Sequence, residues 1–234
     1  MPSTITIQQT VTWAKSFCEQ QPFSINGMEP ALGSANLVLQ TILGPPFTWP
    51  WNRKIISFTT SDQDSSQVGL GDFGFLEGGT VQAASGGKPY EISVKQMLHA
   101  DSSQARPQFC APFLDDGTGN ITFRLTPSPD QSYTVILPYQ RRAPQLMSMG
   151  SFWSPLPDDK NYIAQWGFLA LMSLIGDDAR FNAYNAKFMS TLLAAQGGLT
   201  DMERNIFLAN WTRVMSQLQG TQMGTQERFR SREV

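Results

Sequence analysis

The chain contains three stretches with different hydrophobic patterns. Apolar residues recur every three to four positions in the first stretch, which predicts an amphipathic helix that ends before Pro22 and a second helix from Leu32 to Leu43. Gly44-Pro45-Pro46 ends the second helix, because neither proline can continue it. The pattern then changes to the alternation that is typical of β-strands.

The middle stretch is predicted to be a run of β-strands. Residues 54–60, 73–83 and 90–97 are rich in strand-forming side chains and are separated by turn residues. The clearest signal comes from residues 121–126 and 133–139, which flank a proline-containing turn. We expect these last two strands to pair as a hairpin.

Helical spacing returns in the third stretch. Residues 162–175 are apolar on nearly all sides, which predicts a buried central helix, and residues 181–195 carry an apolar stripe. Thr200 and Glu203 form a capping box at the start of a last helix, because their side chains satisfy free backbone N–H groups there. From Gly220 onward the chain is polar without an apolar period, so we expect a flexible arm.

These patterns predict an α+β fold. The N- and C-terminal segments, residues 1–53 and 151–217, are expected to pack together as a helical bundle, because neither group of helices is large alone. Residues 54–150 would form an antiparallel β module inserted into this bundle. Residues 218–234 would form an extended, flexible C-terminal arm.

Composition favours a soluble protein that assembles with others. Charged residues make up 15% of the chain, against about 25% in a typical globular protein, and a surface with few charges loses less hydration when another subunit covers it. The net charge of −2 excludes nucleic-acid binding through bulk electrostatics. The start of the chain lacks a signal-peptide pattern, and the longest apolar run is too short to cross a bilayer, so we expect no membrane association.

The sequence contains no pattern that we interpret as a catalytic, cofactor-binding or metal site. Gly69–Gly74 matches the dinucleotide-binding pattern, but a β-like stretch follows it where a helix is required, so a turn explains it better. His99 is the only histidine, and no nucleophile motif accompanies it. Cys18 and Cys110 belong to different segments and are not expected to form a disulfide.

Two other classes of function stay open. Trp49 and Trp51, in a proline-flanked hinge, would be exposed aromatic contacts in a tail-associated module that binds glycans or a host surface. Asp115, Asp116 and Glu91 contain an acidic pair that would serve as general acid and base in a cell-wall hydrolase.

The C-terminal residues Arg228-Phe229-Arg230-Ser231-Arg232 combine three cations with one aromatic side chain. Such a segment suits docking onto an acidic groove, with Phe229 as the anchor. It is equally consistent with a solubilising tail.

Several phrases of the sequence resemble structural proteins of tailed bacteriophages. They are Pro46–Arg53 (PFTWPWNR), Asp72–Glu77 (DFGFLE), Gly119–Leu125 (GNITFRL), Trp166–Leu169 (WGFL) and Asp177–Phe181 (DDARF). The order of the predicted segments is similar to that of the head-to-tail adaptor proteins of short-tailed (podovirus-like) bacteriophages.

This resemblance implies a structural virion protein and not an enzyme. Its copies would form a ring, commonly of twelve, that joins the portal to the tail nozzle and lines a channel through which DNA passes without sequence-specific binding. The C-terminal arm would reach the portal, which makes Arg228, Phe229, Arg230 and Arg232 candidate portal contacts. The β module would contact the tail nozzle, the tail fibres or neighbouring adaptors. The protein would be made in the host cytoplasm and located at the head–tail interface of the virion.

Overall fold

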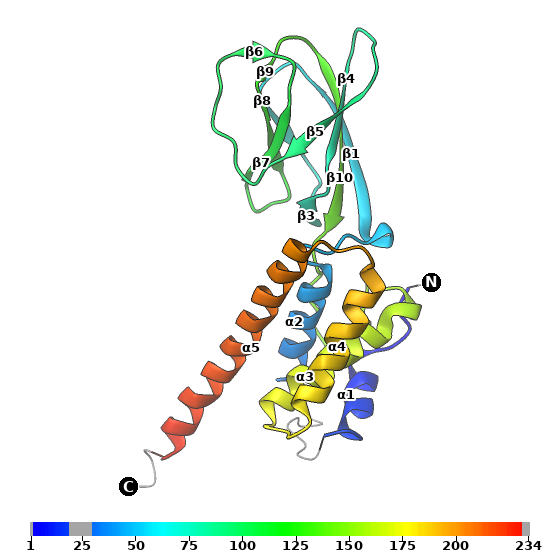
Figure 1. The fold of residues 1–234 in the computed structure, drawn as a ribbon, viewed down its shortest axis with the longest axis vertical. Coiled ribbons are helices and arrows are strands. Elements are labelled where there is room, and N and C mark those ends of the chain that lie inside the picture. The colour runs from blue at the N-terminus through cyan, green and yellow to red at the C-terminus, as the bar shows by residue number, and fades with distance from the viewer. Residues whose placement is uncertain (1, 19–29, 231–234) are drawn as a thin grey trace. The chain divides into compact units, whose positions relative to one another are not determined.

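The structure, a computed structural model, describes residues 2–18 and 30–230 of the 234-residue chain, and the side chains of residues 219–230 lie outside the description. The chain divides into two compact units (Figure 1). Met1–Phe47 and Ala143–Val234 form one unit, called the helical unit below. Thr48–Arg142 form the other, called the β unit.

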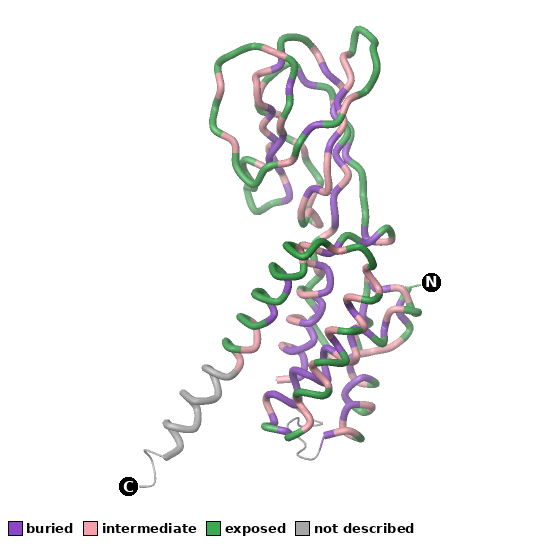
Figure 2. The backbone as a smooth tube through the Cα atoms, in the orientation of Figure 1, coloured by how far each residue is buried: buried purple, intermediate pink, exposed green. Residues whose placement is uncertain are grey.

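The helical unit is built around one buried helix. Its described residues contain α1 (Ile7–Lys15), α2 (Ala31–Leu43), the 3-10 helix η2 (Asp158–Lys160), α3 (Asn161–Ile175), α4 (Phe181–Gln196) and α5 (Asp201–Arg230). α3 contacts each of the other four α-helices, and most of its residues are buried (Figure 2). The predicted buried central helix is therefore confirmed.

Polar side chains link the two sequence segments of the helical unit. The indole Nε1 of the fully buried Trp153 donates to Oγ1 of Thr10 on α1 at 2.8 Å. The amide of Asn36 on α2 accepts from the backbone N–H of Leu146 and donates to its carbonyl oxygen, at 2.7 and 3.1 Å. These bonds satisfy groups that would otherwise be costly to bury.

Gly167 lies where α3 closely approaches two neighbouring helices. A Cβ atom there would lie 2.8 Å from the Phe188 ring on α4 and 2.9 Å from Val38 on α2. Replacing a helical glycine by alanine normally stabilises by about 0.5–1 kcal/mol. For Gly167→Ala we expect the opposite sign, a loss of about 1–3 kcal/mol through overpacking, measured by chemical denaturation. A stabilised variant would show that α2 and α4 can move apart at little cost.

The β unit begins with the 3-10 helix η1 (Pro50–Asn52) and contains ten strands. They are β1 (Arg53–Thr60), β2 (Asp64–Gln67), β3 (Phe73–Leu76), β4 (Gly79–Ala83), β5 (Tyr90–Val94), β6 (Gln104–Ala105), β7 (Phe109–Asp115), β8 (Ile121–Thr126), β9 (Ser128–Pro129) and β10 (Tyr133–Arg141). Seven strands follow the path β1-β10-β4-β5-β7-β8-β2, and β3 pairs with β10 beside it. β6 and β9 form a separate two-stranded sheet.

Alternate side chains of the main sheet surround one apolar core. On β8, Ile121, Phe123 and Leu125 are buried, while the residues between them are half-buried. β10 follows the same rule, with Val135 and Leu137 fully buried. The strand path thus curls into a large, nearly closed barrel-like sheet around a core of its own.

The predicted fold class is wrong. The β part is not an antiparallel module carried by a helical bundle, but a large, nearly closed barrel-like sheet in a mixed α+β chain. Two strand pairs, β5 with β7 and β6 with β9, are parallel. Alternation identifies a strand with one covered face, but it does not say which strand lies beside it, so pairing and closure were not predictable from the pattern.

The predicted hairpin of residues 121–126 and 133–139 is also wrong. Both segments are strands, but β8 pairs with β7 and β2, whereas β10 pairs with β1, β3 and β4. Between them, Ser128–Pro129 forms β9 and pairs with β6. This pairing directs the chain away from β8 before β10 begins.

Residues 218–234 were predicted to form an extended arm. Instead, α5 continues through this segment and ends at Arg230, so residues 218–230 are helical. The remaining residues, 231–234, lie outside the described residues. Glutamine, glutamate, arginine and methionine have good helix propensity, so a helix can continue there without an apolar stripe. None of the described helices combines the length and apolar character that crossing a membrane requires.

The β unit spans residues 48–142, whereas the sequence placed the inserted module at 54–150. The early start follows from polar contacts: Nε2 of Gln140 donates to the Trp49 carbonyl oxygen at 3.0 Å, and Nδ2 of Asn52 donates to the Arg141 carbonyl oxygen at 2.8 Å. Both ends of the insertion are thereby held together within the β unit.

Candidate functional site

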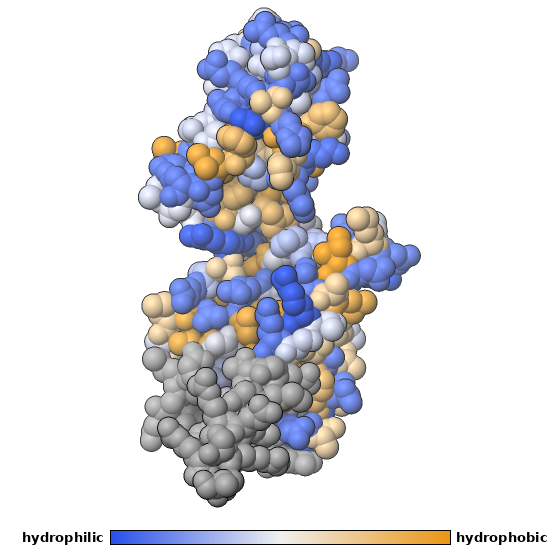
Figure 3. Space-filling model, turned by 90° about the vertical axis from the view of Figure 1, so that its left-hand side faces the viewer, coloured by the Kyte–Doolittle hydropathy of each residue, from blue (hydrophilic) through white to orange (hydrophobic). Residues whose placement is uncertain are grey.

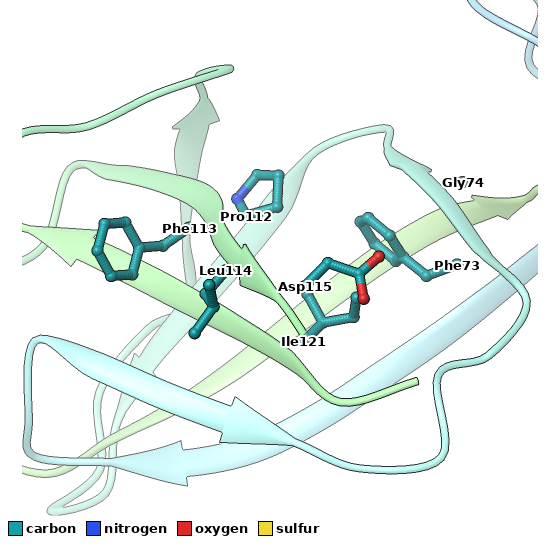
Figure 4. A pocket seen from close by; sticks show the side chains of 7 residues that line it. All are labelled: Phe73, Gly74, Pro112, Phe113, Leu114, Asp115 and Ile121. Carbon is teal, nitrogen blue, oxygen red and sulfur yellow. The ribbon is translucent and has the colours of Figure 1, made fainter. Parts of the chain in front are cut away.

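A pocket of about 240 Å³ opens in the wall of the β unit. Side chains from three strands line it: Phe73 and Gly74 of β3, Pro112–Asp115 of β7, and Ile121 of β8 (Figure 4). The lining is apolar except for Asp115 at the end of β7. An apolar hollow with one polar group at its edge is the usual form of a small binding site.

The pocket exists because β5 stops early. β5 pairs with β7 only at Ser93–Phe109 and Val94–Cys110, and the N–H of Lys95 adds one further bond to the Cys110 carbonyl oxygen at 2.9 Å. β7 continues for five more residues, and among the described strands β8 alone pairs with that part of it. β3, on the other side of the pocket, pairs only with β10.

A β-bulge presents Phe113 at the surface. The β7–β8 register shifts between Pro112 and Leu114, so Phe113 is an extra residue with no partner on β8. Phe113 and Leu114 are 49% and 58% exposed. Figure 3 shows one face of the molecule, on which hydrophobic residues, in orange, are exposed among hydrophilic ones, in blue.

Arg124 of β8 holds the Phe113 ring in place. Its guanidinium lies 3.5 Å from the ring centroid, in cation–π geometry. The same guanidinium donates from Nε and from one terminal nitrogen to the two carboxylate oxygens of Asp64, each at 2.7 Å. The guanidinium contacts Phe113 with its face and binds Asp64 with its edge. Phe113 is therefore a fixed aromatic anchor on the surface, of the kind that protein interfaces use.

The opposite wall is rigid as well. The Phe73 ring lies 5.7 Å from that of Phe123 and 5.4 Å from that of Tyr139. Burial, and then the hydrogen bond to Asp72, raise the pKa of Tyr139 to about 12. Burial alone would raise the pKa of Asp72, but hydrogen bonds from Lys54 and Tyr139 outweigh it and lower that pKa, so Asp72 stays anionic.

Asp115 and Asp116 lie at the turn after β7. Oδ1 of Asp115 accepts from the N–H of Gly117 at 2.8 Å. Asp116 accepts from the backbone N–H of Thr118 and from the side chains of Asn120 and Thr118, and these bonds lower its pKa to about 2. Asp116 is therefore a carboxylate at any ordinary pH and a poor general acid.

Glu91 does not lie close to Asp115 in this geometry. Ser93 pairs with Phe109 in the parallel β5–β7 register, so Glu91 lies level with Pro107, just before β7. Asp115 is eight residues further along, roughly 25 Å away at the rise of a strand, whereas carboxyl pairs of glycosidases lie about 5–9.5 Å apart. His99, the single histidine, is exposed on the segment after β5.

The two hinge tryptophans lie against each other. Trp49 is 3% exposed, Trp51 is half-buried, and their ring centroids are 5.2 Å apart. Trp49 therefore does not offer an open ring face to a sugar, which weakens the glycan-binding alternative. Cys18 and Cys110 are both buried and free, each in a different unit.

The candidate portal contacts cannot be placed at the level of side chains. Arg228, Phe229 and Arg230 belong to the last turn of α5, and their side chains lie outside the description. Arg232 lies outside the described residues altogether.

Sequence reasoning missed Phe113 and Leu114 because it predicted no strand there. The signal was present: Pro112 followed by two consecutive large apolar residues breaks the strict alternation of a strand, and proline in a strand marks an edge or a bulge. Phe73 was placed in a strand, but its position opposite Pro112 depends on pairings that no local pattern contains.

In the described part of the chain, no group of three or more His, Cys, Asp or Glu side chains could hold a metal ion. Comparison of the chain with protein-family models and with curated proteins finds no match.

Proposed function

We propose that this chain is a structural subunit of a tailed-bacteriophage virion, a head-to-tail adaptor whose copies form a ring between the portal and the tail nozzle. The observation that carries the proposal is apolar surface left uncovered on α5. Met202, Ile206 and Leu208 are 74%, 41% and 44% exposed. Phe207 and Trp211 already fill the contact between this helix and its own unit, so the other three residues are available to another subunit.

The β unit supports the proposal in the same way. Ile55 on β1 is 66% exposed, and the Phe113–Leu114 pair projects from the bulge of β7. Exposed apolar side chains that lie next to each other, as Phe113 and Leu114 do, favour protein–protein contacts. The low fraction of charged residues favours them too, since fewer charges must be desolvated when subunits meet.

The proposed role is geometric. A ring of these subunits would join portal to tail, keep the genome channel closed against leakage and let DNA pass during ejection. A channel wall must not hold DNA, because basic groups bind phosphates at every step along the duplex. A chain with a net charge of −2 is consistent with that requirement.

The test is mass in solution by light scattering, with and without purified portal rings. We expect the chain to shift into a large complex of fixed stoichiometry when the rings are added. A chain that stays at 26.0 kDa and does not bind portal rings would overturn the proposal, and assays of glycan binding and cell-wall lysis would follow.

Two variants connect this measurement to residues. Ile206→Asp, at an exposed apolar position of α5, should abolish the large complex, whereas Thr212→Asp, at an exposed polar position of the same helix, should leave it intact. A chain that lacks Arg228–Val234 should keep its helical circular-dichroism signal but bind portal rings more weakly. Unchanged co-sedimentation of this shortened chain would remove its C-terminus from the portal contact.

A further inference from the structure

The wall of the β unit lacks one strand segment. β3 (Phe73–Leu76) and the last residues of β7, Ala111–Asp115, each have a strand neighbour on only one side, and the pocket lies between their two free edges (Figure 4). β5 would fill this position if it continued beyond Val94. We call this position the strand slot. A free strand edge offers unpaired backbone groups to an extended peptide.

The register defines what an incoming strand would meet. If β5 is continued in register with β7, Gln96 lies level with Pro112. After the extra residue Phe113, Leu98 lies level with Asp115, whose partner on β8 is the buried Ile121. Because side chains of a strand alternate between faces, the residues at these two levels point into the pocket. An occupant therefore needs apolar side chains two residues apart.

The chain's own segment after β5 is too short to enter the slot. Filling it to the level of Asp115 would use Lys95–Leu98 and leave six Cα–Cα steps to Gln104 in β6, which span at most about 22 Å. The first β7–β8 pair is Phe109 with Thr126, and Gln104 of β6 pairs with Ser128 of β9, two residues further along the chain than Thr126. Ser128, the partner of Gln104, is seven residues from Ile121, the partner of Asp115, which is roughly 23 Å and slightly more than six steps can span. The β6–β9 pairing keeps this segment out.

The strands of a second copy do not fit either. The slot needs a segment with both edges free, and every strand of the β unit already pairs with at least one other. The occupant must therefore be a segment that is not part of a sheet in its own protein, such as an arm or a linker.

Carboxylates at one end of the slot place a second chemical requirement on the occupant. Asp72, just before β3, lies at the same end of the slot as Asp115, the last residue of β7, and Asp116, which follows it, because β7 runs antiparallel to β3. Lys54 pairs with Asp72 at 2.7 Å, whereas the other two carboxylates have no ion pair among the described residues. A cation at the C-terminal end of the occupant would complement them.

We infer that the strand slot binds an extended arm of another protein by β-augmentation. The arm runs parallel to β7 and antiparallel to β3, directs two apolar side chains into the pocket and carries a lysine or arginine beside Asp115 and Asp116. Leu114, next to the bulge, covers its outer side. The inference requires only the β unit, so it holds whether or not the chain joins a portal.

The test uses the full chain and a labelled peptide of sequence Thr-Val-Thr-Leu-Lys, titrated by fluorescence anisotropy. We expect saturable binding. Methylation of the backbone nitrogens of its second threonine and its lysine should weaken binding about tenfold, because hydrogen bonds to β3 or β7 are lost while the side chains remain. Replacing its lysine by glutamate should weaken binding severalfold. Leu114→Asp in the protein should reduce it about tenfold.

The matched control is Ile136→Asp, on the outer face of β10 and 38% exposed, which should bind as the unaltered chain does. Circular dichroism should show both variants folded. No saturable binding, equal affinity of the methylated peptide, or equal affinity of Leu114→Asp would each overturn the inference. Self-association of the chain that Leu114→Asp abolishes and that the peptide also prevents would assign the slot to a second copy and overturn it as well.

Discussion

Phe123→Ala is expected to lower the free energy of unfolding of the β unit by about 3–5 kcal/mol. Phe123 is fully buried on β8. Its ring lies 6.0 Å from that of Phe58 on β1 and 5.7 Å from that of Phe73 on β3, so it connects strands from both halves of the sheet path. The cavity that alanine would leave cannot close, because a curved sheet with fixed pairing holds the surrounding strands apart.

Hydrogen exchange followed by mass spectrometry checks this result unit by unit. Peptides from residues 48–142 should lose protection, while peptides from α3 keep it, because each unit has its own core. Ile136→Ala, at an exposed position of β10, should stay within about 0.5 kcal/mol of the unaltered chain. Equal loss of protection in both units would show that they unfold as one.

Local patterns predicted individual elements well. The helix predicted at Leu32–Leu43 is α2, Ala31–Leu43, and the strand predicted at 54–60 is β1, Arg53–Thr60. The capping box is present: the Thr200 N–H donates to the Glu203 carboxylate at 2.8 Å, and the Glu203 N–H donates to the Thr200 hydroxyl at 3.3 Å. Each of these features depends on residues within a few positions of one another.

Features that depend on distant residues were not predictable. The strand predicted over 73–83 is broken into β3 and β4, and the strand predicted over 90–97 ends at Val94. Both breaks border the strand slot. After Val94 the chain leads to β6, whose pairing with β9 is not visible in the amino-acid pattern of residues 90–97. The candidate site thus arises from a conflict between local strand propensity and the length of a connection.

Trp211→Ala is expected to cost the helical unit about 3–5 kcal/mol. Trp211 is 1% exposed, its ring lies 4.7 Å from that of Phe188, and its Nε1 donates to Oδ1 of Asn185 at 2.7 Å. Phe207 is the other buried apolar residue among the described side chains of α5, and it packs 4.9 Å from Phe47. Two aromatic residues therefore attach this helix to its unit, and the loss of one should release it.

Chemical denaturation followed by far-ultraviolet circular dichroism measures the loss, and hydrogen exchange in α5 locates it. Trp211→Phe keeps an aromatic ring but leaves the Asn185 amide without its donor, so it should cost only about 1–3 kcal/mol. Leu208→Ala, 44% exposed on the same helix, should change stability by less than about 0.5 kcal/mol. If Trp211→Ala costs no more than Leu208→Ala, α5 is not held by its aromatic side chains. Its uncovered residues could then not be presented at a fixed position to a neighbouring subunit, and the proposed ring would lose its main support.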